Sequence, residues 1–165
     1  MLQSHRRLPV EHKVFANWLY AKSFETPHES TKYMSQLLEF DDQVPLFHYQ
    51  LGIDYMDMYQ YDKAEEYYRQ ALSLEPERPV GLNSLAYFLI DNNRNINEGM
   101  ELVEKALAIN PDYYIPDTKG WGLFKLGKYK ESLELLEKAW ELKPLYDHGI
   151  YLHLQEARKA VAGQR

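Results

Sequence analysis

The sequence predicts an all-α protein, a right-handed α-solenoid of antiparallel helix pairs with a C-terminal capping helix. Three observations predict this fold class. Small residues recur every 34 residues within apolar helical patterns, prolines recur at nearly the same spacing, and polar turn segments separate the helices. A fixed period of this length is typical of stacked repeat proteins, in which each unit buries its apolar face against its neighbours.

The periodic signal extends over about a hundred residues. Two series of small residues carry it, the first spaced by 34 and 34, the second by 35 and 33: Gly52, Ala86 and Gly120, then Ala71, Ala106 and Ala139. One extra turn residue in "DNNRNINEG" and a link after Pro111 that is one residue shorter account for the drift of the second series. Three units in phase predict three successive copies of one structural repeat.

Each unit is interpreted as two helices joined by a short polar turn, such as "QYDK" or "LGKY". The second helix ends before a proline (Pro76, Pro111 or Pro144), because proline cannot continue a helix and disfavours helical geometry in the residue before it. The small residues predict close helix packing, since two helices approach to roughly 8 Å only where one of them lacks side-chain bulk. We expect Gly52 to lie against Ala64 in this way.

An N-terminal helix pair is predicted at residues 9–43. Ser30, Met34 and Leu37 precede Ala64, Tyr68 and Ala71 by 34 residues each, so "ESTKYMSQLLEF" is interpreted as the second helix of a degenerate unit. The segment "VEHKVFANWLYAKSF" would be its first helix, with Phe15 and Trp18 inside the packing. Pro27 and His28 are expected to open the second helix.

A capping helix is predicted at residues 147–161. Its apolar residues Ile150, Leu154 and Ala157 form one stripe, while Gln155, Glu156, Arg158 and Lys159 lie elsewhere on the helix. A repeat stack needs a terminal helix with one polar face, because an apolar end would associate with other copies.

These motifs resemble the tetratricopeptide repeat, whose pattern is W-x2-L-G-x2-Y, then A-x3-F, then P. The unit at 45–78 matches it at Leu51, Gly52, Tyr55, Ala64, Tyr68, Ala71 and Pro76, and departs from it at His48. The units at 79–112 and 113–146 keep the size classes, apart from Pro116 and Lys119 at the start of the third unit. Phrases such as "LNSLAYFLIDNNRNINEGMELVEKAL" are most similar to bacterial members of the family. The resemblance implies a single domain over residues 1–165.

The resemblance also implies a concave face lined by the first helix of each unit. Residues three and four positions apart share a helix face, and the stripe that faces the inner groove in this family corresponds here to an aromatic and polar series. We expect the peptide-binding groove to contain Tyr49, Ile53, Asn83, Tyr87, Tyr114, Asp117, Trp121 and Phe124. Tyr and Trp are frequent at binding hot spots, and an Asn beside an Asp can hold backbone amides or a basic side chain.

Packing is the alternative interpretation of this stripe, because residues on the inner face also bury one another between neighbouring repeats. For Ile53, Ile90 and Phe124 we favour packing over binding. Asp117 has an alternative of its own, since "PDTKG" is a credible helix start in which Asp117 would cap the helix.

Several classes of function are disfavoured by the sequence. The net charge of -6 argues against nucleic acid as the main partner. There is no cysteine, and the histidines show no metal-ligand spacing, so neither a metal nor another cofactor is expected. No apolar run approaches the roughly 20 residues needed to span a membrane. No Lys or Arg lines the central stripe, which argues against the family members that clamp the acidic tails of chaperones.

The sequence therefore predicts a non-enzymatic scaffold that binds a peptide or protein segment in its concave aromatic groove. The alternative is an accessory C-terminal module of a larger enzyme or envelope lipoprotein. Self-association through exposed aromatics such as Tyr59, Tyr61 and Tyr67 is a third possibility. The compartment stays open between the cytoplasm, for the chain as written, and the periplasm or envelope, for a chain from which an upstream signal was removed.

Overall fold

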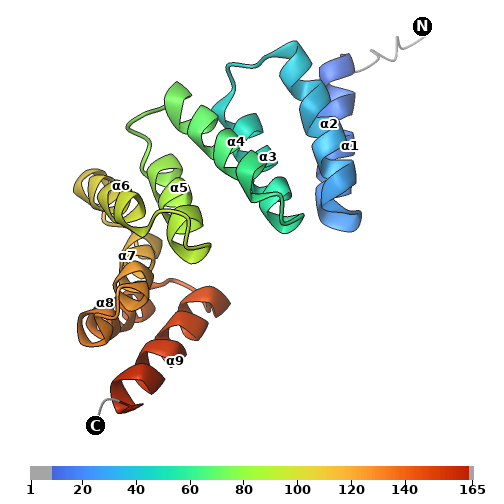
Figure 1. Ribbon diagram of the computed structural model, residues 1–165. Helices are drawn as coiled ribbons and strands as arrows, with labels where there is room; N and C mark the ends of the chain where they lie inside the picture. The colour runs from blue at the N-terminus through green and yellow to red at the C-terminus, as the bar shows by residue number, and fades with distance from the viewer. Residues whose placement is uncertain (1–8, 164–165) are drawn as a thin grey trace, which may run out of the picture. The chain divides into compact units, whose positions relative to one another are not determined.

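The structure, a computed structural model, describes residues 9–163 and contains nine α-helices and no strand within that range (Figure 1). The predicted all-α class is confirmed. Contacts divide the chain into two compact units with the boundary between Glu75 and Pro76. The first unit contains α1 (Val10–Phe24), α2 (Pro27–Phe40), α3 (Pro45–Asp57) and α4 (Tyr61–Leu74). The second contains α5 (Pro79–Asp91), α6 (Ile96–Ile109), α7 (Tyr114–Lys125), α8 (Tyr129–Leu142) and α9 (His148–Gly163).

Helix starts follow the local sequence. Pro27, Pro45 and Pro79 are the first residues of α2, α3 and α5, a position where the missing N–H of proline has no intrahelical partner in any case. The side chain of Thr26 caps α2 by accepting from the N–H of Glu29, and Asn95 caps α6 by accepting from the N–H of Glu98. The predicted opening of the second helix at Pro27 is therefore confirmed.

The turns inside the repeats share one backbone feature at a spacing of 34. Tyr59, Asn93 and Gly127 have φ values of 59°, 53° and 77°, which lie in the left-handed region. Residues 92–95 join α5 to α6 and are one residue longer than the connections 58–60 and 126–128, as the sequence predicts. The shortened link after Pro111 is a wrong prediction. Connections 75–78 and 110–113 have equal length, and α7 is instead one residue shorter than α5, with 12 residues against 13.

The core of the first unit lies where α2 packs against α1 and α3. Its buried side chains are Val14, Trp18, Met34, Leu37 and Leu51, with Tyr55 and Tyr67 packed against them. Phe15 is an incorrect core prediction, because it is 36% exposed and reaches the core only through its ring contact with Trp18, at 5.2 Å between centroids. Of the two aromatic residues predicted to pack on α1, Trp18 is therefore in the core and Phe15 is not.

In the second unit α7 is the central helix and packs against α5, α6, α8 and α9. The largest fully buried side chains of this unit come from all five of its helices, and they include Phe88, Val103, Ile115, Leu136 and Leu154. The apolar stripe predicted for the C-terminal helix is confirmed, since Ile150, Leu154 and Ala157 are all buried.

The small residues explain how closely paired helices pack. A Cβ atom added at Gly52 would lie 2.9 Å from two ring carbons of Tyr68, and one added at Gly120 would lie 2.8 Å from Cγ of Leu136. Ala64 was the expected neighbour of Gly52 and is fully buried, but the atoms closest to the vacant position belong to Tyr68. The helix pairs α3–α4 and α7–α8 thus use a large side chain, not a second small one, to fill the gap.

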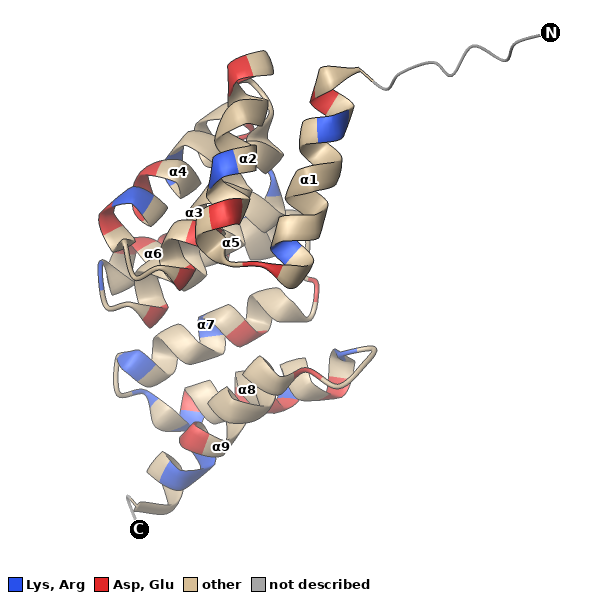
Figure 2. Ribbon diagram, turned by 90° about the vertical axis from the view of Figure 1, so that its right-hand side faces the viewer, with Lys and Arg blue, Asp and Glu red and all other residues tan. Residues whose placement is uncertain are grey.

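Acidic and basic residues are interspersed along the helices of both units (Figure 2). Such mixed charge is typical of solvent-exposed helix faces. Between residues 9 and 163, the structure contains no helix long and apolar enough to cross a membrane.

Candidate functional site

The eight predicted groove residues are divided between the two units. Tyr49 and Ile53 lie on α3 of the first unit and are half-buried. The other six lie on α5 and α7 of the second unit: Asn83, Tyr87, Tyr114, Asp117, Trp121 and Phe124. Because α5, α7 and α9 pack side by side within the second unit, the geometry of a candidate site can be built there.

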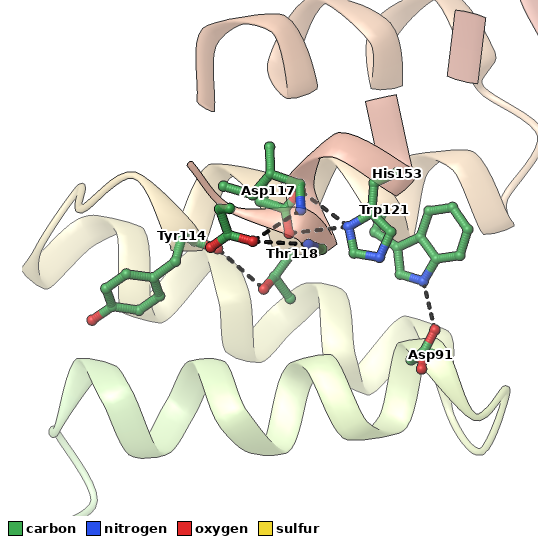
Figure 3. A network of polar contacts seen from close by, with 9 residues as sticks. Asp91, Tyr114, Asp117, Thr118, Trp121 and His153 are labelled. Carbon is green, nitrogen blue, oxygen red and sulfur yellow. Dashed lines mark hydrogen bonds and ion pairs between the residues drawn. The ribbon is translucent and has the colours of Figure 1, made fainter. Parts of the chain in front are cut away.

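A histidine of the capping helix organises the predicted residues of α5 and α7. The Nδ1 atom of His153 lies 3.0 Å and 3.1 Å from the two carboxylate oxygens of Asp117, and both side chains are about nine-tenths buried (Figure 3). The same imidazole ring stacks on Trp121, with 4.3 Å between centroids and 14° between planes. The sequence did not predict that this histidine would contact a groove residue.

Trp121 is held by contacts on its ring and at its indole nitrogen. Phe124 stacks against it with 4.8 Å between centroids and 8° between planes. Its Nε1–H donates to Oδ1 of Asp91 at 2.8 Å, as Figure 3 shows. Lys125 donates from Nζ to the backbone oxygen of Asp91 at 3.1 Å and lies 5.0 Å from the Trp121 ring. These contacts fix the indole in one orientation.

Tyr87 completes the group from α5. Its half-buried ring lies 6.1 Å from the ring of His153. Burial, together with the smaller effects of the negative charges of Asp91, Asp117 and Asp147, raises the pKa of Tyr87 to about 12. We call the set the aromatic–carboxylate cluster, and its members are Tyr87, Asp91, Asp117, Trp121, Phe124 and His153.

Asn83 and Asp117 differ from the open groove positions that the stripe predicts. Asn83 is 8% exposed and Asp117 is 7% exposed. The alternative role of Asp117 as a helix cap is also wrong, because Tyr113 occupies the cap position of α7 and the Asp117 carboxylate is directed to His153. The side-chain oxygen of Asn83, in contrast, is buried without a hydrogen-bond partner in the described chain.

Tyr114 lies apart from the cluster. It begins α7, its ring meets Tyr113 edge-on at 5.6 Å, and its backbone oxygen accepts from the hydroxyl of Thr118 at 3.3 Å. Figure 3 shows its ring at the opposite end of this part of α7 from Trp121. In the first unit, the ring of Tyr49 lies 5.9 Å from that of Tyr68 on α4. Tyr49 thus lies in the packing between α3 and α4.

Of the tyrosines considered for self-association, only Tyr59 is well exposed, at 79%. Tyr61 and Tyr67 are half-buried. Tyr67 stacks on Tyr55 with 5.3 Å between centroids and 6° between planes, and burial raises its pKa, with further contributions from Tyr55 and Glu66. The prediction that all three form an exposed surface is therefore wrong, because Tyr67 belongs to the packing of the first unit.

The sequence interpretation missed a buried ionic group in the first unit. The carboxylate of Asp54, on α3, is fully buried and accepts from Nζ of Lys22 at 2.9 Å and from the hydroxyl of Ser30 at 2.5 Å. Beside it lies a cavity of about 130 Å³, which Glu25, Thr26 and Asp57 also line. The signal was present, because Phe88 and Gly122 follow Asp54 at steps of 34 and a carboxylate is the exception in that series.

The described part of the chain contains no candidate metal site. No group of three or more His, Asp or Glu side chains between residues 9 and 163 could hold a metal ion. His48 is buried, and its Nε2 lies 2.7 Å from the backbone oxygen of Asp42. The contacts of His153 are the carboxylate of Asp117 and the rings of Tyr87 and Trp121.

Comparison with known protein families identifies one of the repeats. The model described as "Tetratricopeptide repeat" matches residues 45–78, the range that contains α3, α4 and the motif from Leu51 to Pro76. Residues 45–78 are thus similar to the tetratricopeptide repeat family. The TPR repeat-containing protein PA4667 of Pseudomonas aeruginosa is 35% identical over 89 residues, which is 53% of this chain but only 15% of that protein. This bacterial relative agrees with the bacterial type of repeat predicted from the sequence.

Several solved structures resemble this protein in fold. PilW, a type IV pilus biogenesis factor, is 23% identical with a TM-score of 0.80, covering 96% of this chain and 72% of its own. The first repeat domain of Spaghetti (RPAP3), solved with the HSP90 peptide SRMEEVD, is 23% identical with a TM-score of 0.61, covering 74% of this chain and 96% of its own. At these identities, the likeness concerns the helical repeat fold alone.

Proposed function

We propose that this tetratricopeptide repeat protein is a non-enzymatic interaction scaffold whose second unit holds an extended segment of a partner protein. The surface that carries the proposal is the aromatic–carboxylate cluster on α5, α7 and α9. Its half-buried rings, Tyr87, Trp121 and Phe124, come from two neighbouring helices, and a histidine from the third helix orders them. Rigid aromatic anchors of this kind give large contact area at small entropic cost.

Preorganisation supports binding over simple packing. Trp121 is fixed by Asp91, and Asp117 is fixed by His153, so neither side chain needs to be ordered when a partner arrives. Tyr87 retains a partly exposed ring beside them. A repeat domain of the same fold has been solved with a bound peptide, which agrees with a segment-binding role for this surface.

The expected affinity is modest. Three or four anchors contribute on the order of 1.5–3 kcal/mol each when they are buried. Association costs about 4–15 kcal/mol in lost freedom of motion. We therefore expect micromolar affinity for an isolated segment. With a net charge of -6, nucleic acid is not the expected partner.

The test compares three versions of the chain as bait for proteins from the source organism: the natural sequence, Tyr87→Ala and Tyr146→Ala. Tyr146 is 67% exposed and lies outside the cluster, so it controls for the loss of a surface ring in the same unit. We expect at least one protein to be retained by the natural sequence and by Tyr146→Ala but lost from Tyr87→Ala. The helical circular dichroism of all three should agree.

Two outcomes would contradict the proposal. Equal retention by all three baits would show that the cluster is not the binding surface. A Tyr87→Ala chain that melts much earlier, with no change in the proteins retained, would show that the tyrosine serves packing only.

A second candidate function is an accessory module of a longer enzyme or envelope protein. The match to PA4667 favours it, because the matched segment is only 15% of that relative. An immunoblot of cells from the source organism decides the question. A band well above the 19.6 kDa of this chain supports the module, and a single band at that mass contradicts it.

A further inference from the structure

We propose that the segment held by α5, α7 and α9 is basic and places a Lys or Arg side chain against the ring of Tyr87. The inference rests on the proposed function, because it names the chemistry of the partner at the same surface. It is carried by the charges around the aromatic–carboxylate cluster and by an unused hydrogen-bond acceptor beside it.

Three carboxylates from different parts of the second unit act electrostatically on Tyr87. Asp91 lies one turn further along α5, Asp117 lies on α7, and Asp147 lies in the connection before α9. Lys125 is a cation beside the cluster, and its ammonium group is already bonded to the backbone oxygen of Asp91 and lies over Trp121. The opposing ring is His153, which shares a hydrogen bond with Asp117. The formal charges of the carboxylates therefore outnumber that of the ammonium group.

The field of these carboxylates acts on anything placed at the Tyr87 ring. The negative charges that disfavour the tyrosinate, and so help to raise the pKa of Tyr87 to about 12, favour an ammonium or guanidinium group at the same place. An aromatic face adds attraction for a cation that lies within about 6 Å of the ring centroid. A basic side chain thus gains from the ring and from the carboxylates together.

Asn83 supplies a second, independent observation. It lies one turn before Tyr87 on the same face of α5, is 8% exposed, and has a buried side-chain oxygen without a hydrogen-bond partner in the described structure. Buried acceptors are nearly always paired in native proteins. This oxygen can accept a hydrogen bond, and a guanidinium group or a backbone amide of the bound segment would donate one after rotation of the Asn83 amide.

An unbiased selection tests the charge of the segment. A phage library of random dodecapeptides is selected on the immobilised full chain and depleted on the Tyr87→Ala variant. We expect the enriched peptides to carry a positive net charge relative to the starting library, with Arg or Lys as the most enriched residues. Enrichment of neutral or acidic peptides would overturn the inference while leaving the proposed binding surface intact.

Charge-neutral variants then test the residues. The most enriched peptide is labelled and titrated by fluorescence anisotropy against Asp91→Asn, Asp147→Asn and Glu134→Gln. Each Asp→Asn change keeps an oxygen for its present donors, the Trp121 indole or the N–H groups of Gly149 and Ile150. Glu134 is exposed on α8, outside the cluster. Glu134→Gln is therefore the control, because it removes the same charge at a site away from the cluster.

We expect Asp91→Asn and Asp147→Asn each to weaken binding by about threefold, as for partly exposed charge pairs, and Glu134→Gln to leave it unchanged. Raising the salt concentration from about 0.05 M to about 0.5 M should weaken it as well. Equal affinities for all three variants would overturn the inference. If no peptide is enriched on the natural chain relative to Tyr87→Ala, the result would contradict the proposed function. It would then also contradict the inference of a basic segment.

Discussion

Gly52 shows how a single missing side chain sets the distance between two helices. The ring of Tyr68 occupies the space where a Cβ of residue 52 would lie, and Tyr68 is only 5% exposed. Its hydroxyl is 4.0 Å from the sulfur of Met56, and its ring contacts Tyr49, so the ring has neighbours on several sides. The small residue is therefore required by the packing of α3 on α4, although the backbone there is ordinary helix.

We expect Gly52→Ala to lower the free energy of unfolding by about 1–2 kcal/mol. Overpacking a filled core costs about 1–3 kcal/mol, and the better helix propensity of alanine offsets part of that cost. Urea denaturation measures the change. Gly163→Ala is the matched control, because a Cβ there meets nothing within 4 Å. A Gly52→Ala chain as stable as the Gly163→Ala chain would show that Tyr68 moves aside freely.

The ionisation of the Tyr87 phenol affects the stability of the fold. Its pKa in the folded protein is about 12, above the ordinary value of about 10. The folded state then holds the phenolic proton more strongly than the unfolded state, so this contribution is complete below pH 10 and is lost as the pH rises toward 12.

We expect the free energy of unfolding of the natural chain to fall more steeply between about pH 10 and 12 than that of Tyr87→Phe, by about 2 kcal/mol in total. Urea titrations at several pH values measure both slopes, and phenol absorbance follows the titration directly. Parallel slopes for the two proteins would mean that Tyr87 ionises as easily folded as unfolded.

At the scale of elements, α1 is attached to the first repeat by charge as well as by apolar packing. Lys22 of α1 and Ser30 of α2 both bind the carboxylate of Asp54 on α3. The equivalent positions on α5 and α7 hold the buried residues Phe88 and Gly122. Buried ion pairs often stabilise less than the apolar residues that could replace them, so this group specifies how α1 and α2 meet α3 more than it adds stability.

Removing one partner of the Lys22–Asp54 ion pair should destabilise the fold. We expect Lys22→Met to lower the free energy of unfolding by about 1–3 kcal/mol, because it leaves a buried carboxylate with Ser30 as its remaining partner. The estimate is at the low end for buried pairs since the Lys22 side chain is 33% exposed. The double change Lys22→Met with Asp54→Leu should recover most of the loss. Chemical denaturation of both variants provides the comparison.

The control for this experiment is Lys32→Met, which removes an exposed bridge to Glu29 on the same unit. Exposed pairs contribute about 0–1 kcal/mol, so little change is expected. If the double variant were no more stable than Lys22→Met alone, the Asp54 carboxylate would not be the source of the penalty.

At the scale of the whole molecule, two compact units divide the contacts of the chain. In repeat proteins each element packs only on near neighbours, so stability is approximately a sum of local terms. Met34 is fully buried in the first unit and Leu136 in the second. They offer a matched pair of large apolar side chains, one in each unit.

We expect Leu136→Ala to increase amide hydrogen exchange in α7, α8 and α9 more than in α1 and α2, and Met34→Ala to do the reverse. Each change should cost about 2–5 kcal/mol within its unit, through lost burial and the cavity left behind. Exchange measured by mass spectrometry resolves the two regions. Uniform acceleration along the chain in both variants would mean that the units unfold together.

The helix pairs follow from the sequence because their signals are short-range. Gly52, Ala86 and Gly120 mark the first helices, prolines open α2, α3 and α5, and the turn residues Tyr59, Asn93 and Gly127 repeat the same backbone geometry. Each signal concerns a residue and its neighbours within one unit of 34 residues, so periodicity alone determined the all-α class and the order of the helices.

Only the tertiary structure decided which polar side chains meet. His153 binds Asp117 across 36 residues, and Lys22 binds Asp54 across 32. The stripe on α5 and α7 included Asp117 and Trp121, yet it did not reveal that a histidine of α9 would contact both side chains. A period fixes which face of a helix points inward, whereas the pairing of two side chains depends on how far neighbouring helices are shifted and rotated, and those quantities are set by packing.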